Sequence, residues 1–206
     1  MDPWRIEEER TSLPTPRWEE LVAEARDLTA VILDLNHLIH RSNPWQTAGV
    51  LPSDALPELS KAGQITTPVA ALIEARPVWQ EGRMRVWVRG HCRADMVMTC
   101  VRCLADFPLD LTASIQAYYA VGADPAIQSR QWHIEEDLEF LTDGVLKIRH
   151  LVEEELLLAL PMHPVCVSGC AGLCSACGAD LNRNPCGCRV QASGSPFAVL
   201  KNWQFS

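Results

Sequence analysis

Apolar and polar side chains alternate along the middle of the chain. Met84, Val86 and Val88 alternate with basic or aromatic residues, which is the period-two pattern of a strand with one apolar face. Three further apolar stretches are expected to form strands, at Val69–Trp79, Met96–Cys103 and Leu109–Val121. Gaps of hairpin length separate these stretches, so the pattern predicts a small antiparallel β-meander sheet.

After residue 144 the pattern changes to a helical period. Apolar residues recur at steps of three and four: Val145, Ile148, Val152, Leu156 and Ala159. This spacing predicts one long helix over residues 144–160 that packs by a single face. Pro161 and Pro164 would end it.

The order of these elements predicts an α+β fold with a C-terminal zinc knuckle. Thr29–Ile39 is apolar and is expected to form a first strand. We divide the chain into an acidic, loosely held arm (1–27), an α+β domain (28–165) with an irregular proline-rich insert (41–67), a cysteine-rich zinc-binding segment (166–190) and a short C-terminal helix (191–206).

Charge and length restrict the possible functions. The 206 residues carry a net charge of −8, which argues against a dedicated sequence-independent nucleic-acid binder, because such binders neutralise phosphates with basic residues. The acidic N-terminus has no apolar core of a signal peptide, and no apolar run is long enough for a membrane span. A cytoplasmic protein is therefore expected, in which thiols stay reduced.

Cysteine is the most informative residue type. Eight of the nine cysteines have metal-ligand spacing: Cys100 and Cys103 as C-x₂-C, then Cys166, Cys170, Cys174, Cys177, Cys186 and Cys188. Eight thiols suffice for two tetrahedral Cys₄ sites, so we expect one or two zinc ions. Cys92 is expected to be an ordinary buried thiol.

The thiols are expected to form two groups of four. Cys174/Cys177 would pair with Cys186/Cys188, and Cys100/Cys103 with Cys166/Cys170. His163 could replace a missing thiol at either end of the run. An iron–sulfur cluster and a thiol redox role for the first C-x₂-C remain alternatives.

The basic face of the strand at 83–89 is a candidate RNA surface. Arg83, Arg85, Trp87 and Arg89 alternate on this face, and Arg93 and Arg102 could extend it. Arginines can bind phosphates while an aromatic ring stacks on an unpaired base. The alternative is a solvated sheet face with a packed tryptophan.

Acidic residues gather later in the chain. The run Glu153–Glu155 is expected to be a solvated helix face, although it could attract a basic protein. The histidines and carboxylates form no spacing typical of hydrolysis, and the chain has no phosphate-binding glycine loop or nucleophile elbow. The sequence therefore favours a protein that is not an enzyme.

The order of the pieces resembles the YceD-like family (domain of unknown function 177), the large ribosomal RNA subunit accumulation proteins. The resemblance lies in Cys100-Val-Arg-Cys103-Leu104, the Leu-Ala-Leu-Pro161 helix end, the segment from Cys170 to Asn182 with Cys186-Gly-Cys188, and Pro196–Leu200. It implies a non-enzymatic bacterial or plastid factor that binds 23S ribosomal RNA or an early large-subunit particle. The alternative is a zinc-ribbon adaptor that binds only a protein, either a ribosomal protein or a regulator.

Overall fold

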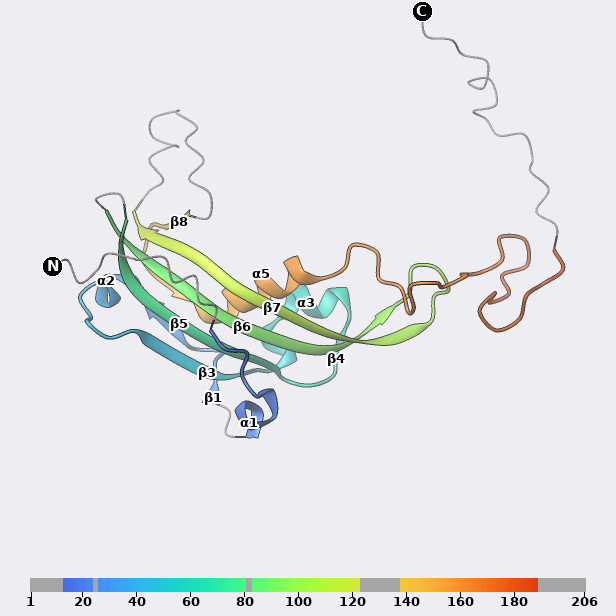
Figure 1. Cartoon of the computed structure of the whole chain (residues 1–206), viewed down its shortest axis with the longest axis horizontal. Helices are drawn as coiled ribbons and strands as arrows, with labels where there is room; N and C mark the ends of the chain where they lie inside the picture. The colour runs from blue at the N-terminus through green and yellow to red at the C-terminus, as the bar shows by residue number, and fades with distance from the viewer. Residues whose placement is uncertain (1–12, 24–25, 81–82, 123–137, 189–206) are drawn as a thin grey trace, which may run out of the picture. The chain divides into compact units, whose positions relative to one another are not determined.

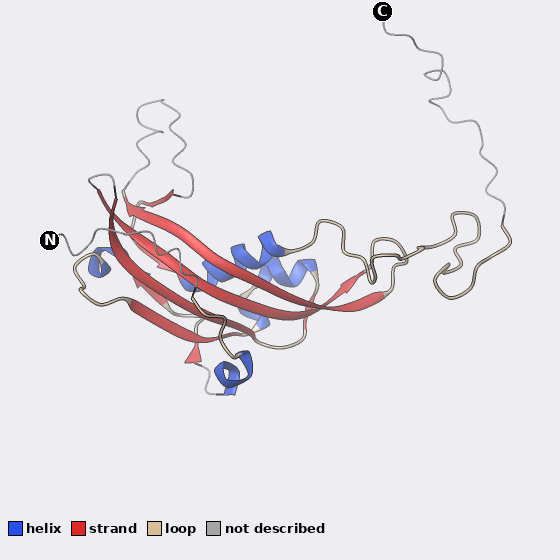
Figure 2. Cartoon of the chain, in the orientation of Figure 1, coloured by secondary structure: helices blue, strands red, loops and turns tan. Residues whose placement is uncertain are grey.

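The structure is a computed structural model that describes residues 13–23, 26–80, 83–122 and 138–188. Strands account for more of the described chain than helices do (Figures 1 and 2). The chain divides into two compact units, Met1–Met98 with Pro108–Met162 and Thr99–Phe107 with His163–Ser206. The first unit contains the main sheet, and the second contains eight of the nine cysteines.

The main sheet has seven strands within the described residues. Its path runs β1 (Arg26–Asp27), β3 (Trp45–Leu51), β5 (Val69–Gln80), β6 (Arg83–Thr99), β7 (Asp106–Val121) and β8 (Leu138–Leu141), and β4 (Gln64–Ile65) pairs with β6. The β1–β3 and β7–β8 pairs are parallel, whereas β3–β5, β4–β6 and β5–β6 are antiparallel. The expectation of a small, wholly antiparallel sheet was therefore wrong.

Parallel neighbours require a crossover connection, which a search for hairpin-length gaps does not detect. The link from β1 to β3 passes through β2 (Ile32–Asp34) and α2 (Leu35–Leu38), and β2 pairs with β9 (Val145–Lys147) in a second, two-stranded sheet. With the mixed sheet, the few helices give an α+β architecture.

The core lies on the apolar face of β6. Val86, Val88 and Met96 are each no more than 1% exposed, and α5 (Ile148–Ala159) buries Leu151 and Leu156. Burial and the charge of Glu155 in α5 raise the pKa of Cys92 in β6 to about 12, which places this helix close to the sheet. Cys92 is fully buried, as expected of an ordinary core thiol.

Two expected elements have different bounds or character in the structure. The predicted strand 29–39 is only β2 followed by α2, because the Asp34 side chain accepts hydrogen bonds from the N–H groups of Asn36 and His37 and starts a helix. The predicted helix 144–160 begins at Ile148, since the preceding residues form β9.

The proline-rich stretch at 41–67 is ordered, which corrects the prediction of an irregular insert. It contains β3, a 3₁₀ turn (Ser53–Ala55), α3 (Pro57–Ala62) and β4. Its prolines lie at element boundaries: Pro57 is in the first turn of α3, where its missing N–H costs nothing. The irregular segment was predicted from the number of prolines, without regard to where each proline lies relative to the strands and helices.

The N-terminal segment is described only in part, and it includes α1 (Trp18–Ala23). The short helix predicted over 191–206 lies outside the described residues. Among the helices that the structure describes, none is long and apolar enough to cross a membrane.

Glu153 is buried, although the run Glu153–Glu155 was expected to be solvated. Its residue is 8% exposed, and its Oε1 accepts hydrogen bonds from the backbone N–H groups of Glu58 (2.7 Å) and Leu59 (3.1 Å). These N–H groups belong to the first turn of α3, where they have no partner within the helix. Glu153 thus joins α5 to the N-terminus of α3, while Glu154 is exposed.

Candidate metal centre

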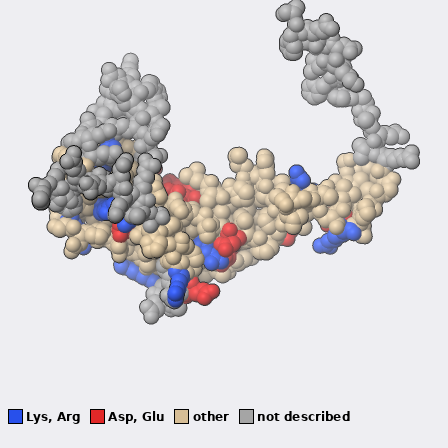
Figure 3. All heavy atoms as spheres, in the orientation of Figure 1, with Lys and Arg blue, Asp and Glu red and all other residues tan. Residues whose placement is uncertain are grey.

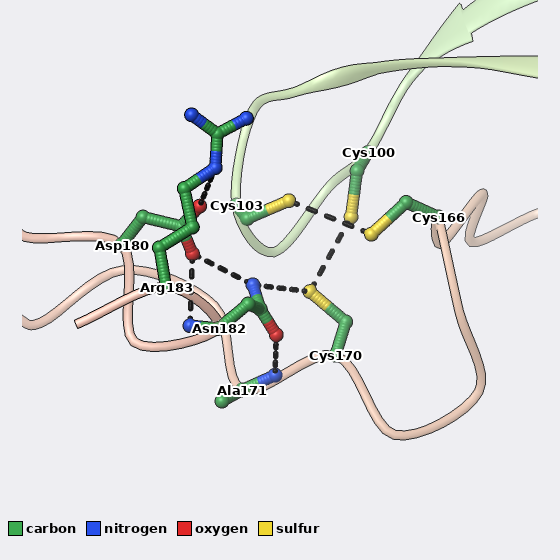
Figure 4. A network of polar contacts seen from close by, with 8 residues as sticks. All are labelled: Cys100, Cys103, Cys166, Cys170, Ala171, Asp180, Asn182 and Arg183. Atoms are coloured by element: carbon green, nitrogen blue, oxygen red, sulfur yellow. Dashed lines mark hydrogen bonds and ion pairs between the residues drawn. The ribbon is translucent and has the colours of Figure 1, made fainter. Parts of the chain in front are cut away.

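The eight clustered thiols lie in two groups of four in the second unit. Within each group, all sulfur atoms lie within 4.8 Å of one another. The first group is Cys100, Cys103, Cys166 and Cys170 (Figure 4), and the second is Cys174, Cys177, Cys186 and Cys188. These are the same two fours that the sequence predicts, and each could hold a metal ion.

The first C-x₂-C turn folds back on itself through two backbone hydrogen bonds. Leu104 N–H donates to the carbonyl of Cys100 (2.9 Å), and Cys100 N–H donates to the carbonyl of Ala105 (2.9 Å). Leu104 has a φ of 58°, in the left-handed region that side chains other than glycine rarely adopt. This conformation turns both thiols of the motif to one side.

The second C-x₂-C turn has the same backbone pattern. Gly178 N–H donates to Cys174 O (2.8 Å), Cys174 N–H donates to Ala179 O (2.9 Å), and Gly178 has a φ of 73°. Two segments of different sequence therefore adopt one turn geometry that presents two thiols. This repeated geometry is the strongest structural indication that both groups are metal sites.

The left-handed residue differs between the two turns, and this difference gives a pair of opposite predictions. Leu104→Gly should raise the free energy of unfolding by about 0.5–1 kcal/mol, because relief of the left-handed strain exceeds the added freedom of the unfolded chain. Gly178→Ala should lower it by about 1 kcal/mol through strain alone, since no atom lies within 4 Å of the added Cβ.

Chemical denaturation of the metal-loaded protein measures both changes. A Leu104→Gly variant that is less stable than the natural protein would show that packing of the leucine side chain stabilises the fold by more than its left-handed backbone destabilises it. That outcome is not expected, since Leu104 is 65% exposed.

The first group is buried and is formed by two separate chain segments. Cys100 and Cys170 are 0% and 1% exposed, and their sulfurs lie 3.8 Å apart. Cys103 and Cys166 have sulfurs 3.6 Å apart. Val101 N–H donates to the Pro164 carbonyl (2.9 Å) and holds the two segments together beside the thiols. Apolar residues pack around the group: Ala105, Phe107, Val165 and Leu173.

Arg102 supports this group from outside the ligand set. Its backbone N–H donates to the sulfur of Cys100 (3.4 Å), and its guanidinium Nη1 donates to the Cys170 carbonyl (2.9 Å). Amide donors of this kind stabilise a ligating thiolate and fix its direction. From the sequence, Arg102 was predicted to extend an RNA surface, and its contacts with the thiol group were missed, although its position inside the C-x₂-C motif was a signal.

The second group is more open to solvent. Cys174 is 8% exposed and Cys186 is half-buried, whereas Cys177 and Cys188 are exposed. The described residues thus contain one enclosed and one accessible thiol group. A metal ion in the accessible group should exchange more readily.

The thiols of each group have unequal pKa values. Burial would raise the pKa of Cys100, but backbone N–H groups, including that of Arg102, outweigh it and lower the pKa to about 6. Backbone N–H groups of Cys177 and Ala176 likewise lower the pKa of Cys174 to about 6. One thiolate therefore forms readily in each group.

One thiol of each group is much harder to ionise. Burial and the other thiols raise the pKa of Cys166 to about 12, and neighbouring Cys177 and Cys186 raise the pKa of Cys188 to about 12. Four thiolates in one place repel one another, and a bound divalent cation would remove this cost. Four sulfur ligands in a tetrahedron suit zinc or iron.

The strand face predicted to bind RNA is largely covered. Arg85 and Trp87 are only 5% and 7% exposed, and the guanidinium groups of Arg76 and Arg89 lie 4.4 and 4.9 Å from the centre of the Trp87 ring. Tyr118 stacks on the same tryptophan, with ring centroids 6.3 Å apart. This tryptophan is therefore not available for stacking on a base in this conformation.

The charges on this face also have partners in the protein. Arg89 forms an ion pair with Glu74 (2.7 Å), and Arg93 pairs with Asp95 (3.1 Å) and Asp110 (3.0 Å). Arg83 begins β6, and its side chain lies outside what the structure describes. On the face shown in Figure 3, basic and acidic side chains are interspersed.

RNA binding by this face would need Arg85 and Trp87 to be exposed, whereas the tryptophan is packed, as in the alternative interpretation. Period-two alternation in one strand does not show what covers that strand. The Leu13 carbonyl accepts a hydrogen bond from His91 Nε2 (2.7 Å), so the N-terminal segment crosses the same face of β6. RNA contact by these arginines stays a prediction, without an exposed tryptophan to support it.

A comparison with protein families identifies the family of the chain. The family model described as "Large ribosomal RNA subunit accumulation protein YceD" matches residues 88–203, which is more than half of the chain. The chain belongs to the YceD family. The matched region contains β7, α5 and both thiol groups, so the candidate metal centre is part of the YceD region.

One curated relative is similar over a shorter length. "Uncharacterized protein ML1660" of Mycobacterium leprae (strain TN) is 28% identical over 100 residues. The match covers 48% of this chain and 45% of the relative, so the chain spans less than half the length of that protein. No solved structure matches the chain.

Proposed function

We propose that this member of the YceD family is a non-enzymatic cytoplasmic factor for the accumulation or assembly of the large ribosomal subunit. It binds 23S ribosomal RNA or an early large-subunit particle. The observation that carries the proposal is the family match, which spans both thiol groups and is described by large ribosomal RNA accumulation.

The proposed metal is zinc, one ion in each thiol group. Four cysteines fill all four positions of a tetrahedral site and leave none for a substrate, which is typical of structural zinc. In this role zinc fixes the fold of the second unit and presents the tips of its two turns. The second unit then provides the binding surface that the covered face of β6 does not.

Arg183 is a highly exposed basic group of that surface. Its side chain is 80% exposed, and among the described residues it forms an ion pair with Asp180 at 3.5 Å. Such a weak exposed pair leaves the guanidinium able to reach a phosphate. Arg102 is also exposed at the tip of the first turn, but it supports the Cys100 and Cys170 region as well.

Crosslinking of the full chain to RNA in cells, followed by sequencing of the bound RNA, tests this proposal. We expect enrichment of large-subunit ribosomal RNA or its precursor, and a loss of several-fold in Arg183→Glu. Lys61→Glu is the matched control, because Lys61 is 70% exposed and lies in the first unit. Recovery of RNA no different from an unrelated protein would contradict RNA binding.

A protein partner is the second candidate, and exposed aliphatic side chains favour it. Val101, Leu104 and Val167 in the second unit are 52%, 65% and 58% exposed.

Acidic residues of the first unit also favour a protein partner. Burial and repulsion between neighbouring carboxylates raise the pKa values of Glu139 and Glu155, and Glu154 contributes to both shifts. A basic ribosomal protein would relieve this repulsion. Association that survives ribonuclease treatment would support this candidate instead.

A further inference from the structure

Asn182 belongs in sequence to the second thiol group but contacts the first. It lies between Cys177 and Cys186 along the chain. Its Nδ2 donates to the sulfur of Cys170 (3.4 Å), and its Oδ1 accepts a hydrogen bond from the backbone N–H of Ala171 (2.7 Å) (Figure 4). One side chain from the second group's loop therefore contacts the sulfur of a first-group ligand and the backbone N–H of the residue that follows it.

Asp180 fixes the orientation of this amide. Asp180 Oδ1 accepts hydrogen bonds from the backbone N–H (3.0 Å) and from Nδ2 (2.7 Å) of Asn182, and Asp180 Oδ2 pairs with Arg183 (3.5 Å). The amide has the partners it needs in one orientation only, since a flip would turn its NH₂ group towards the Ala171 N–H. Both protons of Nδ2 are therefore directed, one to a carboxylate and one to a sulfur.

The loop that carries Asn182 is continuous with the second turn. An isolated bridge joins Leu173 to Asp180, and Leu181 N–H donates to the Gly172 carbonyl (2.9 Å). Cys174 and Cys177 precede the loop, and Cys186 and Cys188 follow it. A metal ion shared by these four cysteines would fix both ends of the loop and so the position of Asn182.

The contact lies on a ligand that has no access to solvent. Cys170 is 1% exposed, so a donor to its thiolate replaces hydrogen bonds that water would otherwise provide. Hydrogen bonds to metal ligands from outside the ligand set change metal affinity by roughly 10–100-fold. Loss of the Asn182 amide should therefore weaken metal retention in the first group.

We propose that the second thiol group controls metal retention in the first group through Asn182, which acts as a positioning residue for the Cys170 thiolate. This inference rests on the proposed zinc binding but not on the RNA partner. The metal in the accessible group orders the loop, and the ordered loop then supports the enclosed group. Loss of zinc from the second group would thus loosen the zinc held by the first.

Zinc release from the purified full chain to an excess of a coloured chelator tests the role of Asn182. The natural protein should release zinc in a fast phase from the accessible group and a slow phase from the enclosed group. In Asn182→Ala the slow phase should accelerate by roughly 10–100-fold. Asn184→Ala is the matched control, because Asn184 lies in the same exposed loop and, among the described residues, bonds to Asp180 through its backbone N–H.

Asn182→Asp separates the sulfur contact from the backbone contact. An aspartate at this position keeps a carboxylate oxygen that can accept the hydrogen bond from the Ala171 N–H. It replaces the amide group that donates to the Cys170 sulfur with a negatively charged oxygen, which cannot donate. The slow phase should therefore accelerate at least as much as in Asn182→Ala. An unchanged slow phase in Asn182→Asp and Asn182→Ala would overturn the proposal.

Cys177→Ser tests the dependence of one group on the other. Removing a second-group ligand should accelerate release from the first group, and adding Asn182→Ala should then have little further effect, since both changes remove the same support. A slow phase unaffected by Cys177→Ser would overturn the coupling. A natural protein without zinc would overturn the metal assignment as well, whereas a failed RNA crosslink would leave the coupling result intact.

Discussion

Replacing Cys170 with serine is expected to remove one zinc ion per chain and to unfold much of the second unit. Cys170 is buried in the first thiol group, where its sulfur lies 3.8 Å from that of Cys100. Serine is a poor zinc ligand, and the three remaining thiols would keep their mutual repulsion without a full tetrahedron. Structural zinc contributes on the order of 10 kcal/mol to folding, so the loss should exceed that of any ordinary core substitution.

Metal analysis and thermal unfolding of the zinc-loaded protein measure this effect. Cys92→Ala is the matched control: Cys92 is also a fully buried cysteine, but it lies in the first unit and outside both groups. The control should keep its full zinc content and lose only modest stability. Retention of all zinc by Cys170→Ser, or loss of zinc from Cys92→Ala, would contradict the assignment.

Glu153→Ala should be strongly destabilising for the first unit. It leaves the N–H groups of Glu58 and Leu59 at the start of α3 without the carboxylate they bind. Hydrogen bonds to a charged group contribute about 1.5–3 kcal/mol, so the free energy of unfolding should fall by about 2–3 kcal/mol. Glu153→Gln, which keeps an acceptor oxygen, should lose less.

Urea unfolding of the natural protein, Glu153→Ala and Glu153→Gln tests this prediction. Glu154→Ala is the control, at the next residue of α5. Glu154 is exposed, and its charge helps to raise the pKa values of Glu139 and Glu155. Its removal should leave stability unchanged or slightly higher. Equal losses in Glu153→Ala and Glu154→Ala would show that the contact with α3 contributes nothing.

The grouping of the thiols could be predicted from the sequence because metal-ligating cysteines occur at a few fixed spacings along the chain. A C-x₂-C turn presents two ligands, and two such pairs fill a tetrahedron. Cys100/Cys103 needed a second pair, and Cys166/Cys170 were the thiols left over. The packing face of α5 could be predicted for a similar reason, since Ile148, Val152 and Leu156 repeat with the helical period and are buried.

Features that depend on a distant partner could not be predicted in this way. The face of β6 that carries Trp87 alternates like a solvated strand, but Arg76, Arg89 and Tyr118 cover its aromatic ring. Glu153 looks like its neighbours in the acidic run until the N-terminus of α3 is placed beside it. In each case, the local pattern gave the correct strand or helix but not the partner that covers the side chain.

Asn182 shows the same limit at the metal centre. An asparagine between two cysteine pairs is ordinary turn chemistry, and nothing in its spacing points to Cys170. Only the fold of the loop after Gly178 brings its amide to that sulfur. The members of each thiol group could thus be predicted from sequence spacing, whereas the residue that contacts one of them from the neighbouring loop could not.

We expect each group of four cysteines in the second unit to hold one zinc ion. Native mass spectrometry of the full natural chain, with elemental analysis of the same preparation, measures the number and the kind of the bound ions. It should find two zinc ions per chain and no disulfide bonds in the intact protein. One zinc ion or none, or iron with inorganic sulfide in their place, would rule out this assignment.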